Sequence, residues 1–597
     1  MKKIRFSLVY RDMYQSSGKY QPNKEQLERV APAIIDMGCF SRVETNGGAF
    51  EQVCLLRGEN PNEAVRTFTA PFNKVGIQTH MLDRGLNALR MYPVPADVRR
   101  LMYKVKKKQG TDITRIFDGL NDVRNIIPSI EYAKEGGMIP QATLCITTSP
   151  IHTAEYYSAI ADQLIEAGAT EICLKDMAGI GQPAMLGKLT GMIKKNHPEI
   201  IIQYHGHSGP GLSMASILEV CRNGGDIIDT AVEPLSWGKV HPDIISVQSM
   251  LKHYGFEVAD INMDAYMEVR KLTQEFIDDF LGYFMNPANK LMSSLLLGCG
   301  LPGGMMGSMM ADLKGIMQVI NNTRKGKGLQ PYSEDELLVK LFNEVAYVWP
   351  RVGYPPLVTP FSQYVKNIAL MNLLTLEQGK PRFTMMDDNM WGMILGKSGR
   401  LPGSVDPELV ELAKQKGKEF TDVDPQTLYP DELDKFREMM KQEGWDEGKD
   451  QEELFELAMH ENQYRDYRSG VAKQRFQDEL KKARAPKPQS VAHPKPQPHP
   501  QPQPQPAPAK KREEDIPIIA TETGPIEWEM APAADDMSRY RRYGSSRFRD
   551  DAFFLMESLS TRLLYIPETI EGRKVDIVAK QGQNVRRGDI IGYVRGK

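Results

Sequence analysis

The stretch Ile200-Ile-Ile-Gln-Tyr-His-Gly-His207 places two histidines directly after a short apolar run. Such a run is typical of a buried strand, and a regular strand would point His205 and His207 to the same face. Two further polar residues, Asp12 and Lys175, also follow short apolar runs. If all these runs are strands of one parallel barrel, the four side chains meet at its carboxyl-terminal mouth.

These residue types indicate a metal site. Two imidazoles and a carboxylate are ligands for Zn²⁺, Mn²⁺ or Co²⁺, and Lys175 becomes an oxygen ligand if it takes up CO₂ as a carbamate. Each residue also has a simpler role: the His-Gly-His pair could be only hydrogen-bonded, Lys175 could pair with Asp176, and Asp12 could cap a helix. Because the residues stand at separate strand ends, we predict a metal site on an enzyme.

Composition restricts the class of protein. The chain has 597 residues, which is too many for one hydrophobic core, so several domains are expected. The net charge of -2 provides no overall field that would attract nucleic acid, and we expect no such partner. The 6 cysteines are scattered without metal-type spacing, which favours reduced thiols and a cytoplasmic protein. No apolar run approaches the roughly 20 residues that span a bilayer.

Residues 1–260 alternate between short apolar runs, polar turns and amphipathic stretches. Eight candidate strands and this length predict an α/β fold, a TIM (β/α)8 barrel of about 250 residues. The candidate strands are residues 4–10, 43–44, 77–82, 113–117, 143–147, 172–174, 200–204 and 227–230. Residues 156–168 and 214–224 have helical spacing and stop at glycine, as helices between the strands would.

Three further segments follow the predicted barrel. Residues 261–484 are rich in helical patterns and predict a mainly helical domain, interrupted by the proline-rich passage Gly353–Pro360. Residues 485–512 are rich in proline and glutamine and predict an extended linker. Residues 513–597 predict a small, partial β tail.

A set of motifs in residues 1 to about 440 is specific in combination. The motifs are Arg11–Ser16, Glu44–Ala49, Arg115–Arg124, Thr147–Thr153, Leu174–Gly179, Asp226–Ala231 and Gly353–Pro360. Together they resemble the carboxyltransferase component of biotin-dependent 2-oxo acid carboxylases and decarboxylases, such as that of two-subunit pyruvate carboxylase and the oxaloacetate decarboxylase alpha subunit. The resemblance implies transfer of CO₂ between carboxybiotin and pyruvate or oxaloacetate through a metal-stabilised enolate.

The resemblance also implies roles for single residues. The implied metal ligands are Asp12, Lys175 as a carbamate, His205 and His207. Arg84 would grip the substrate carboxylate through its planar fork of donors, and Gln15 would hydrogen-bond the 2-oxo group. The metal and Arg84 would together stabilise the negative charge of the enolate.

The chain departs from this family at several positions. Lys239 stands where a threonine carries a proton between biotin and the substrate, so Lys239 is either the catalytic proton carrier or the partner of a larger anionic substrate. His241 stands where glutamine is usual. Tyr14 and Asn46 also differ from the usual residues, and both could reshape the pocket.

Residues 574–594 resemble part of a biotinyl domain without its Met-Lys-Met tip. We therefore expect biotin on a separate subunit, the biotin carboxyl carrier protein. The other expected partners are a biotin carboxylase or membrane decarboxylase subunits, and the resemblance implies a homodimer or a larger oligomer.

Two other classes of function stay open. An acyl-CoA-directed barrel lyase or synthase shares the Arg-Asp and His-x-His motifs but needs no carbamate at Lys175. A non-catalytic scaffold subunit is favoured by Lys239 and by the missing biotin site, and it is opposed by the intact metal-site residues and Arg84.

Overall fold

Eight parallel strands close into a barrel in this computed structural model, with β1 to β8 in chain order and β8 pairing with β1. The strands are β1 (Arg5–Leu8), β2 (Phe40–Gly47), β3 (Gln78–Asp83), β4 (Ile113–Phe117), β5 (Ile139–Cys145), β6 (Glu171–Asp176), β7 (Ile201–Gly206) and β8 (Ile227–Thr230). Each predicted strand overlaps one of these, so the predicted TIM barrel is confirmed.

The described residues are 2–295, 297, 303–445, 450–485, 515–519, 524–531, 563–567, 569–570, 573–580, 583–585 and 589–595. They belong to two compact units, residues 1–486 and 487–597. The predicted linker falls almost entirely on residues 486–514, which lie outside the described residues. None of the described helices is long and apolar enough to cross a bilayer.

Helices surround the barrel, and polar side chains begin several of them. The helices are α1 (Tyr10–Ser17), α2 (Lys24–Asp36), α3 (Phe50–Arg57), α4 (Pro61–Lys74), η1 (Gly85–Asn87), α5 (Ala96–Lys108), α6 (Val123–Glu135), α7 (Ala154–Glu166), α8 (Pro183–Asn196), α9 (Ser213–Arg222) and α10 (Ile244–His253). Asn23 forms a capping box with Gln26, and Asp122, Thr153 and Asp243 each accept a backbone N–H at a helix start. These caps satisfy donors that have no partner within the helix.

The barrel interior contains charged side chains that pair with each other. Arg42 donates to both oxygens of Glu171, with a nearest separation of 2.6 Å, and Arg115 lies 2.6 Å from Asp229. Gln203 joins the two pairs, because its Oε1 accepts from Arg42 and its Nε2 donates to Asp229. Buried charges are stable only when they are paired and hydrogen-bonded in this way.

The helical region after the barrel has its own hydrophobic core. It contains α11 (Met263–Asp279), η2 (Leu281–Phe284), η3 (Pro287–Lys290), α13 (Gly303–Gly326), α14 (Glu334–Arg351), α15 (Phe361–Glu377), α16 (Asp388–Ile394), α17 (Pro407–Gln415) and η4 (Pro425–Leu428). Leu341 and Val345 of α14 pack with Ile368 of α15 in this second core, whereas α11 packs on the barrel helix α2. The predicted helical region is thereby confirmed.

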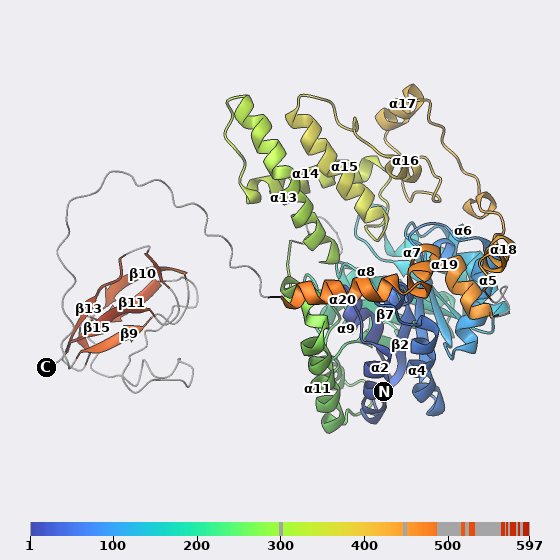
Figure 1. Ribbon diagram of the computed structural model, residues 1–597, viewed down its shortest axis with the longest axis horizontal. Helices are drawn as coiled ribbons and strands as arrows, with labels where there is room; N and C mark the ends of the chain where they lie inside the picture. Colours follow the sequence, from blue (N-terminus) through green and yellow to red (C-terminus); the bar gives the residue numbers. More distant parts are fainter. Residues whose placement is uncertain are drawn as a thin grey trace. The chain divides into compact units, whose positions relative to one another are not determined.

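The last helices of the first unit return to the barrel: α18 (Leu433–Gln442), α19 (Gln451–Arg468) and α20 (Val471–Arg484). Helix α20, the long orange helix in Figure 1, packs against α3 and α19. Helix α19 leaves helical geometry at His460, where φ is -136° and ψ is 46°. Buried Arg90 donates to the carbonyl oxygens of Ala458 and Met459 beside this break. The guanidinium therefore replaces hydrogen bonds that the kink removes.

The described residues of the tail form short strands, as predicted. They are β9 (Ile516–Ile519), β10 (Gly524–Ala531), β11 (Leu563–Pro567), β12 (Thr569–Ile570), β13 (Arg573–Ile577), β14 (Gln583–Val585) and β15 (Ile590–Val594). Strands β12, β13, β15 and β9 form one antiparallel sheet, and β11, β10 and β14 form a second sheet. The likeness of this tail to a biotinyl domain stays a prediction.

Helix α19 buries an acid against α3 and α5. Glu456 is fully buried, and neither carboxyl oxygen has a hydrogen-bond partner among the described residues. Burial raises the pKa of Glu456 from 4.5 to about 8, although the nearby Lys106 opposes the shift. Lys106 is already paired with Glu51 at 2.7 Å. The folded protein therefore keeps a proton on Glu456 that the unfolded chain would release at lower pH.

This buried acid predicts a pH dependence of stability. Because the folded-state pKa exceeds the unfolded one, stability falls as the pH rises from about 4.5 to about 8. Glu456→Gln removes this pH-dependent loss of stability, so the Tm of the variant should exceed that of the wild type most clearly above about pH 8. Each kcal/mol of regained unfolding free energy should raise the Tm by roughly 2–4 °C. Differential scanning fluorimetry across this range measures the effect, with the more exposed Glu461→Gln as control. Parallel wild-type and Glu456→Gln curves would contradict it.

Candidate metal centre

Polar side chains at or just after the carboxyl ends of β1, β6, β7 and β8 lie close together and form a cluster. His205 lies on β7 and pairs in register with Lys175 on β6, while His207 follows directly after β7. Asp12 lies in the first turn of α1, just after β1. One ligand atom from each of four buried residues lies within 4.8 Å of the others: Asp12, His205, His207 and His241. The structure thus gathers three of the four predicted metal ligands at the barrel mouth.

Hydrogen bonds orient two of the imidazoles. His205 Nδ1 lies 2.7 Å from Asp229 Oδ2, and His207 Nδ1 lies 2.7 Å from the carbonyl oxygen of Lys239. A carbonyl oxygen and an ionised carboxylate only accept, so we assign the proton of each ring to Nδ1, which leaves each Nε2 as the acceptor. His207 Nε2 is 3.5 Å from Asp12 Oδ2. Carboxylates and carbonyls that fix the far side of a histidine are typical supports of metal ligands.

Charge in the cluster suits a cation. Burial lowers the pKa of His205 well below its ordinary value and that of His207 to about 4, so both rings are neutral near pH 7. Burial opposes ionisation of Asp12, but His207, His241 and Arg11 outweigh it and hold the pKa of Asp12 well below its ordinary value. One carboxylate among neutral imidazoles is a donor set that fits a divalent cation.

His241 is a member of the cluster for which the sequence had indicated no role. Its Nε2 lies 3.4 Å from Asp12 Oδ2, and its ring centroid lies 4.3 Å from that of His205. The available signal was a histidine shortly after the eighth predicted strand. That signal is weak, because nothing in the local sequence shows that this loop folds back over the mouth.

Lys175 is buried at the same level of the barrel. Its Nζ lies 4.7 Å from the centre of the Phe117 ring and 3.4 Å from Met177 Sδ. Among the described residues it forms no ion pair with a carboxylate, and Asp176 instead accepts backbone N–H groups of Ile180 and Gly181. The alternative of a Lys175–Asp176 ion pair is therefore wrong. Burial lowers the pKa of Lys175, which favours the neutral amine that reacts with CO₂.

Gln15 and Arg84 meet at the segment that follows β2. Arg84 Nη1 donates to the carbonyl oxygen of Gly48 at 3.0 Å. Gln15 Oε1 accepts from Arg11 Nη1 at 2.7 Å and from the Ala49 N–H at 3.3 Å. Gly48 has φ +63°, and a Cβ there would lie 2.9 Å from both Arg11 Nη1 and Gln15 Oε1. The positive φ favours glycine at this position, because the two side-chain ends could shift but the backbone conformation is strained for other residues.

Gln15 and Arg84 form one rim of the site. Arg11 connects this rim to the cluster, a role that the sequence had not indicated. Its Nη1 donates to Asp12 Oδ1 at 3.2 Å as well as to Gln15, and its Nη2 donates to buried Glu44. Asp12 and Gln15 are thus held by one guanidinium. The predicted substrate-contacting residue is fixed relative to the predicted metal ligand.

The Lys239 side chain binds Asn289 in this structure. Its Nζ donates to Asn289 Oδ1 at 2.9 Å, while its carbonyl oxygen holds His207. Tyr14 and Asn46 are fully buried, with polar contacts to Tyr10 and to Thr111. Tyr14 is two residues after Asp12 on one helix, so the two side chains point to opposite sides. An effect of Tyr14 and Asn46 on the shape of the pocket stays a prediction.

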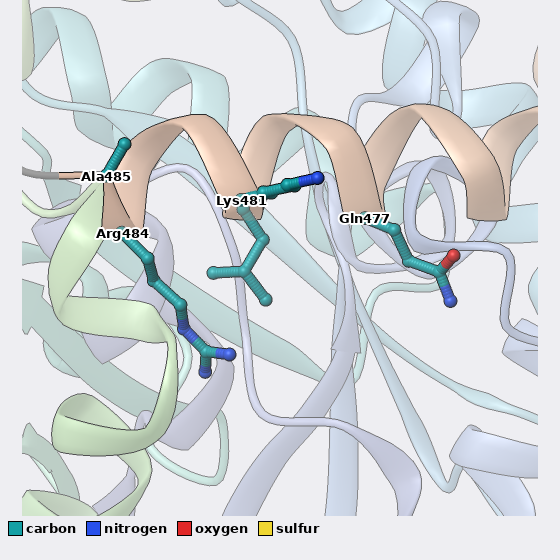
Figure 2. Close-up of a pocket in the computed structure, with 5 residues that line it drawn as sticks. Gln477, Lys481, Arg484 and Ala485 are labelled. Carbon is teal, nitrogen blue, oxygen red and sulfur yellow. The ribbon is translucent and has the colours of Figure 1, made fainter.

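A surface pocket lies along helix α20 (Figure 2). It is lined by Gln477, Leu480, Lys481, Arg484 and Ala485. Arg484 is already bound, since its Nη2 donates to the carbonyl oxygen of Asp279 at 2.7 Å. The pocket contains none of the cluster residues, so we place the chemistry at the barrel mouth instead.

Comparisons with known proteins agree with this architecture. A family profile described as a conserved carboxylase domain matches residues 335–498, and one described as HMGL-like matches residues 104–258. The methylmalonyl-CoA carboxyltransferase 5S subunit of Propionibacterium freudenreichii is 30% identical over 431 residues, which cover 72% of this chain and 80% of that protein. A pyruvate carboxylase subunit of Methanocaldococcus jannaschii is 29% identical over 440 residues, covering 73% of this chain and 72% of that protein.

A solved structure shows the same fold. The carboxyl transferase domain of Rhizobium etli pyruvate carboxylase, with pyruvate and biocytin, superimposes with a TM-score of 0.68 at 22% identity, covering 79% of this chain and 78% of that chain. The fold is that of a carboxyl transferase barrel domain. The chain belongs to the family of carboxyltransferase subunits of biotin-dependent carboxylases, which confirms the predicted resemblance.

Asp229 provides a test of the cluster geometry. Asp229→Asn weakens the acceptor that orients His205, so the affinity of the metal-stripped protein for Co²⁺ should fall about 10–100-fold in calorimetric titration. The variant should also melt earlier, because Arg115 loses its buried charge partner. Asp162→Asn is the matched control, since Asp162 contacts His197 in a partly exposed pair between α7 and α8. Unchanged Co²⁺ affinity in folded Asp229→Asn would contradict this view of the site.

Proposed function

We propose that this chain transfers a carboxyl group between carboxybiotin, carried on a separate protein, and a small 2-oxo acid, with pyruvate and oxaloacetate as the first pair. The observation that carries the proposal is the buried cluster at the barrel mouth, with Arg84 and Gln15 on the adjoining rim. The name of the pyruvate carboxylase subunit among the relatives supports this choice of substrate.

We assign the metal to the cluster, with Zn²⁺, Mn²⁺ or Co²⁺ as candidates. The assigned ligands are Asp12, His205, His207 and Lys175 as a carbamate. The fit rests on the buried Nε2 of His207, which has no hydrogen-bond partner among the described residues, and on the single carboxylate beside it. A divalent cation there would stabilise the negative charge that develops on the substrate oxygen as carbon gains or loses CO₂.

Arg84 and Gln15 bind and orient the substrate in this proposal. Arg84 uses one donor on Gly48 and keeps the rest of its planar fork for a carboxylate. Gln15 Oε1 is occupied by Arg11 and by the Ala49 N–H, so the amide NH₂ is left to donate. A 2-oxo oxygen accepts hydrogen bonds only, and the orientation of Gln15 matches that need.

Lys239 carries the proton in this proposal. In the carboxylating direction, the N–C bond of carboxybiotin breaks and a C–C bond forms at the substrate methyl carbon. The methyl proton must then reach the biotin nitrogen. Burial lowers the pKa of Lys239, which raises the fraction of neutral amine able to accept that proton. Asn289 holds its Nζ by a hydrogen bond at 2.9 Å.

The same proposal implies partners. Biotin arrives on a biotin carboxyl carrier protein that is loaded by a biotin carboxylase, or unloaded by membrane decarboxylase subunits, and the chain acts in the cytoplasm as at least a dimer. Residues 1–260 form the catalytic barrel domain and 261–484 the helical domain. Residues 485–512 act as the linker to the tail, 513–597.

The proposal is tested by direct assay. The metal-loaded chain with carboxybiotin and pyruvate should form oxaloacetate, and Arg84→Ala should lower kcat/KM about 100–1000-fold through lost charge stabilisation. Arg100→Ala, at a half-exposed ion pair with Glu135, should leave the rate unchanged. Lys175→Ala should abolish transfer. No product with pyruvate, 2-oxoglutarate or an acyl-CoA acceptor would reject the carboxyltransferase proposal and favour a scaffold subunit.

A further inference from the structure

His241 is buried in the cluster without a hydrogen bond for its ring. It is fully buried, and neither Nδ1 nor Nε2 has a hydrogen-bond partner among the described residues. Its ring centroid lies 4.3 Å from that of His205 and 4.4 Å from that of His207. Leaving a buried polar atom unpaired costs about 1–3 kcal/mol, so this arrangement calls for a further binding partner.

Hydrogen bonds of the backbone hold the loop that carries His241. Before it, the Ser208 N–H donates to the carbonyl oxygen of Val240 at 2.7 Å, and His207 Nδ1 donates to that of Lys239. At His241 itself, the carbonyl oxygen accepts from the Trp237 N–H at 2.8 Å. The loop after β8 is thus fastened to the segment after β7, and this fastening sets the two imidazoles side by side.

Asp12 by itself does not satisfy the imidazoles around it. Its Oδ2 lies 3.4 Å from His241 Nε2 and 3.5 Å from His207 Nε2, and neither contact meets hydrogen-bond geometry. Four potential ligand atoms within 4.8 Å of one another surround a common point instead. A cation at that point would engage the free nitrogens and the carboxylate together.

We propose that His241 is a further ligand of the same divalent metal, so that Asp12, His205, His207 and His241 retain the cation even when Lys175 carries no carbamate. This inference rests on the proposed function, because it concerns the metal of that site. Three neutral imidazoles and one carboxylate leave a net charge of +1 on the loaded site. Lys175 is then required for the transfer reaction but not for metal retention.

The test compares metal binding with and without CO₂. The metal-stripped full chain is titrated with Co²⁺ in CO₂-free buffer and in bicarbonate buffer. In CO₂-free buffer, wild type and Lys175→Ala should bind one Co²⁺ per chain with the same affinity. His241→Gln restores the residue usual in the family. This variant should bind Co²⁺ at least about 10–100-fold more weakly in CO₂-free buffer, because loss of a direct ligand should lower the affinity at least as much as loss of a residue that orients a ligand. Combining Lys175→Ala with His241→Gln should remove binding in both buffers.

A second readout is independent of affinity and of activity. The visible absorption of bound Co²⁺ responds to its ligands, so His241→Gln should change the spectrum and Lys175→Ala should not. His253→Gln makes the same substitution at an exposed histidine at the end of α10 and should match wild type in both measurements.

The outcomes separate this inference from the proposed function. Unchanged affinity and spectrum in His241→Gln would overturn the inference and leave His241 as a neighbour of Asp12 only. Wild-type binding that requires bicarbonate would also overturn it, while supporting the carbamate and the proposed function. Absence of any Co²⁺ binding by the wild type in either buffer would overturn both.

Discussion

The buried ion pair between Arg115 and Asp229 supports the rest of the site. Both side chains are fully enclosed inside the barrel, and Arg115 Nη1 lies 2.6 Å from Asp229 Oδ2. Two such charges are stable in a low-dielectric interior only if their remaining donors and acceptors are also bound. Gln141 and His205 provide those contacts. The pair therefore connects strands β4, β7 and β8 and turns His205 Nε2 toward the mouth.

Polar layers continue along the inside of the barrel on either side of this pair. Arg42 and Glu171 form the next ion pair, and Gln203 bridges it to Asp229. Directional bonds of this kind specify which residues of adjacent strands face each other, whereas apolar packing tolerates more alternatives. The cluster at the mouth continues the same arrangement, with a carboxylate among imidazoles.

The loop after β8 carries two of the departures from the family pattern, Lys239 and His241. The carbonyl oxygen of Lys239 orients His207, and this role does not depend on the side chain. A change from threonine to lysine at this position is therefore compatible with an intact histidine cluster. The side chain of His241 adds an imidazole to the cluster. In our proposals the two substitutions therefore act on different parts of the site, Lys239 on the proton path and His241 on the metal.

Sequence alone predicted the eight strands, the helical region, the β tail and the presence of Asp12 and His205 near one mouth, because periodicity and short motifs are local properties. It did not predict the roles of His241 and Arg11 in the site. It also did not predict that α19 packs on the barrel, or that Arg90 donates a hydrogen bond to the carbonyl oxygen of Ala458. These features arise from contacts between residues far apart in the chain, and only the folded barrel brings such residues together.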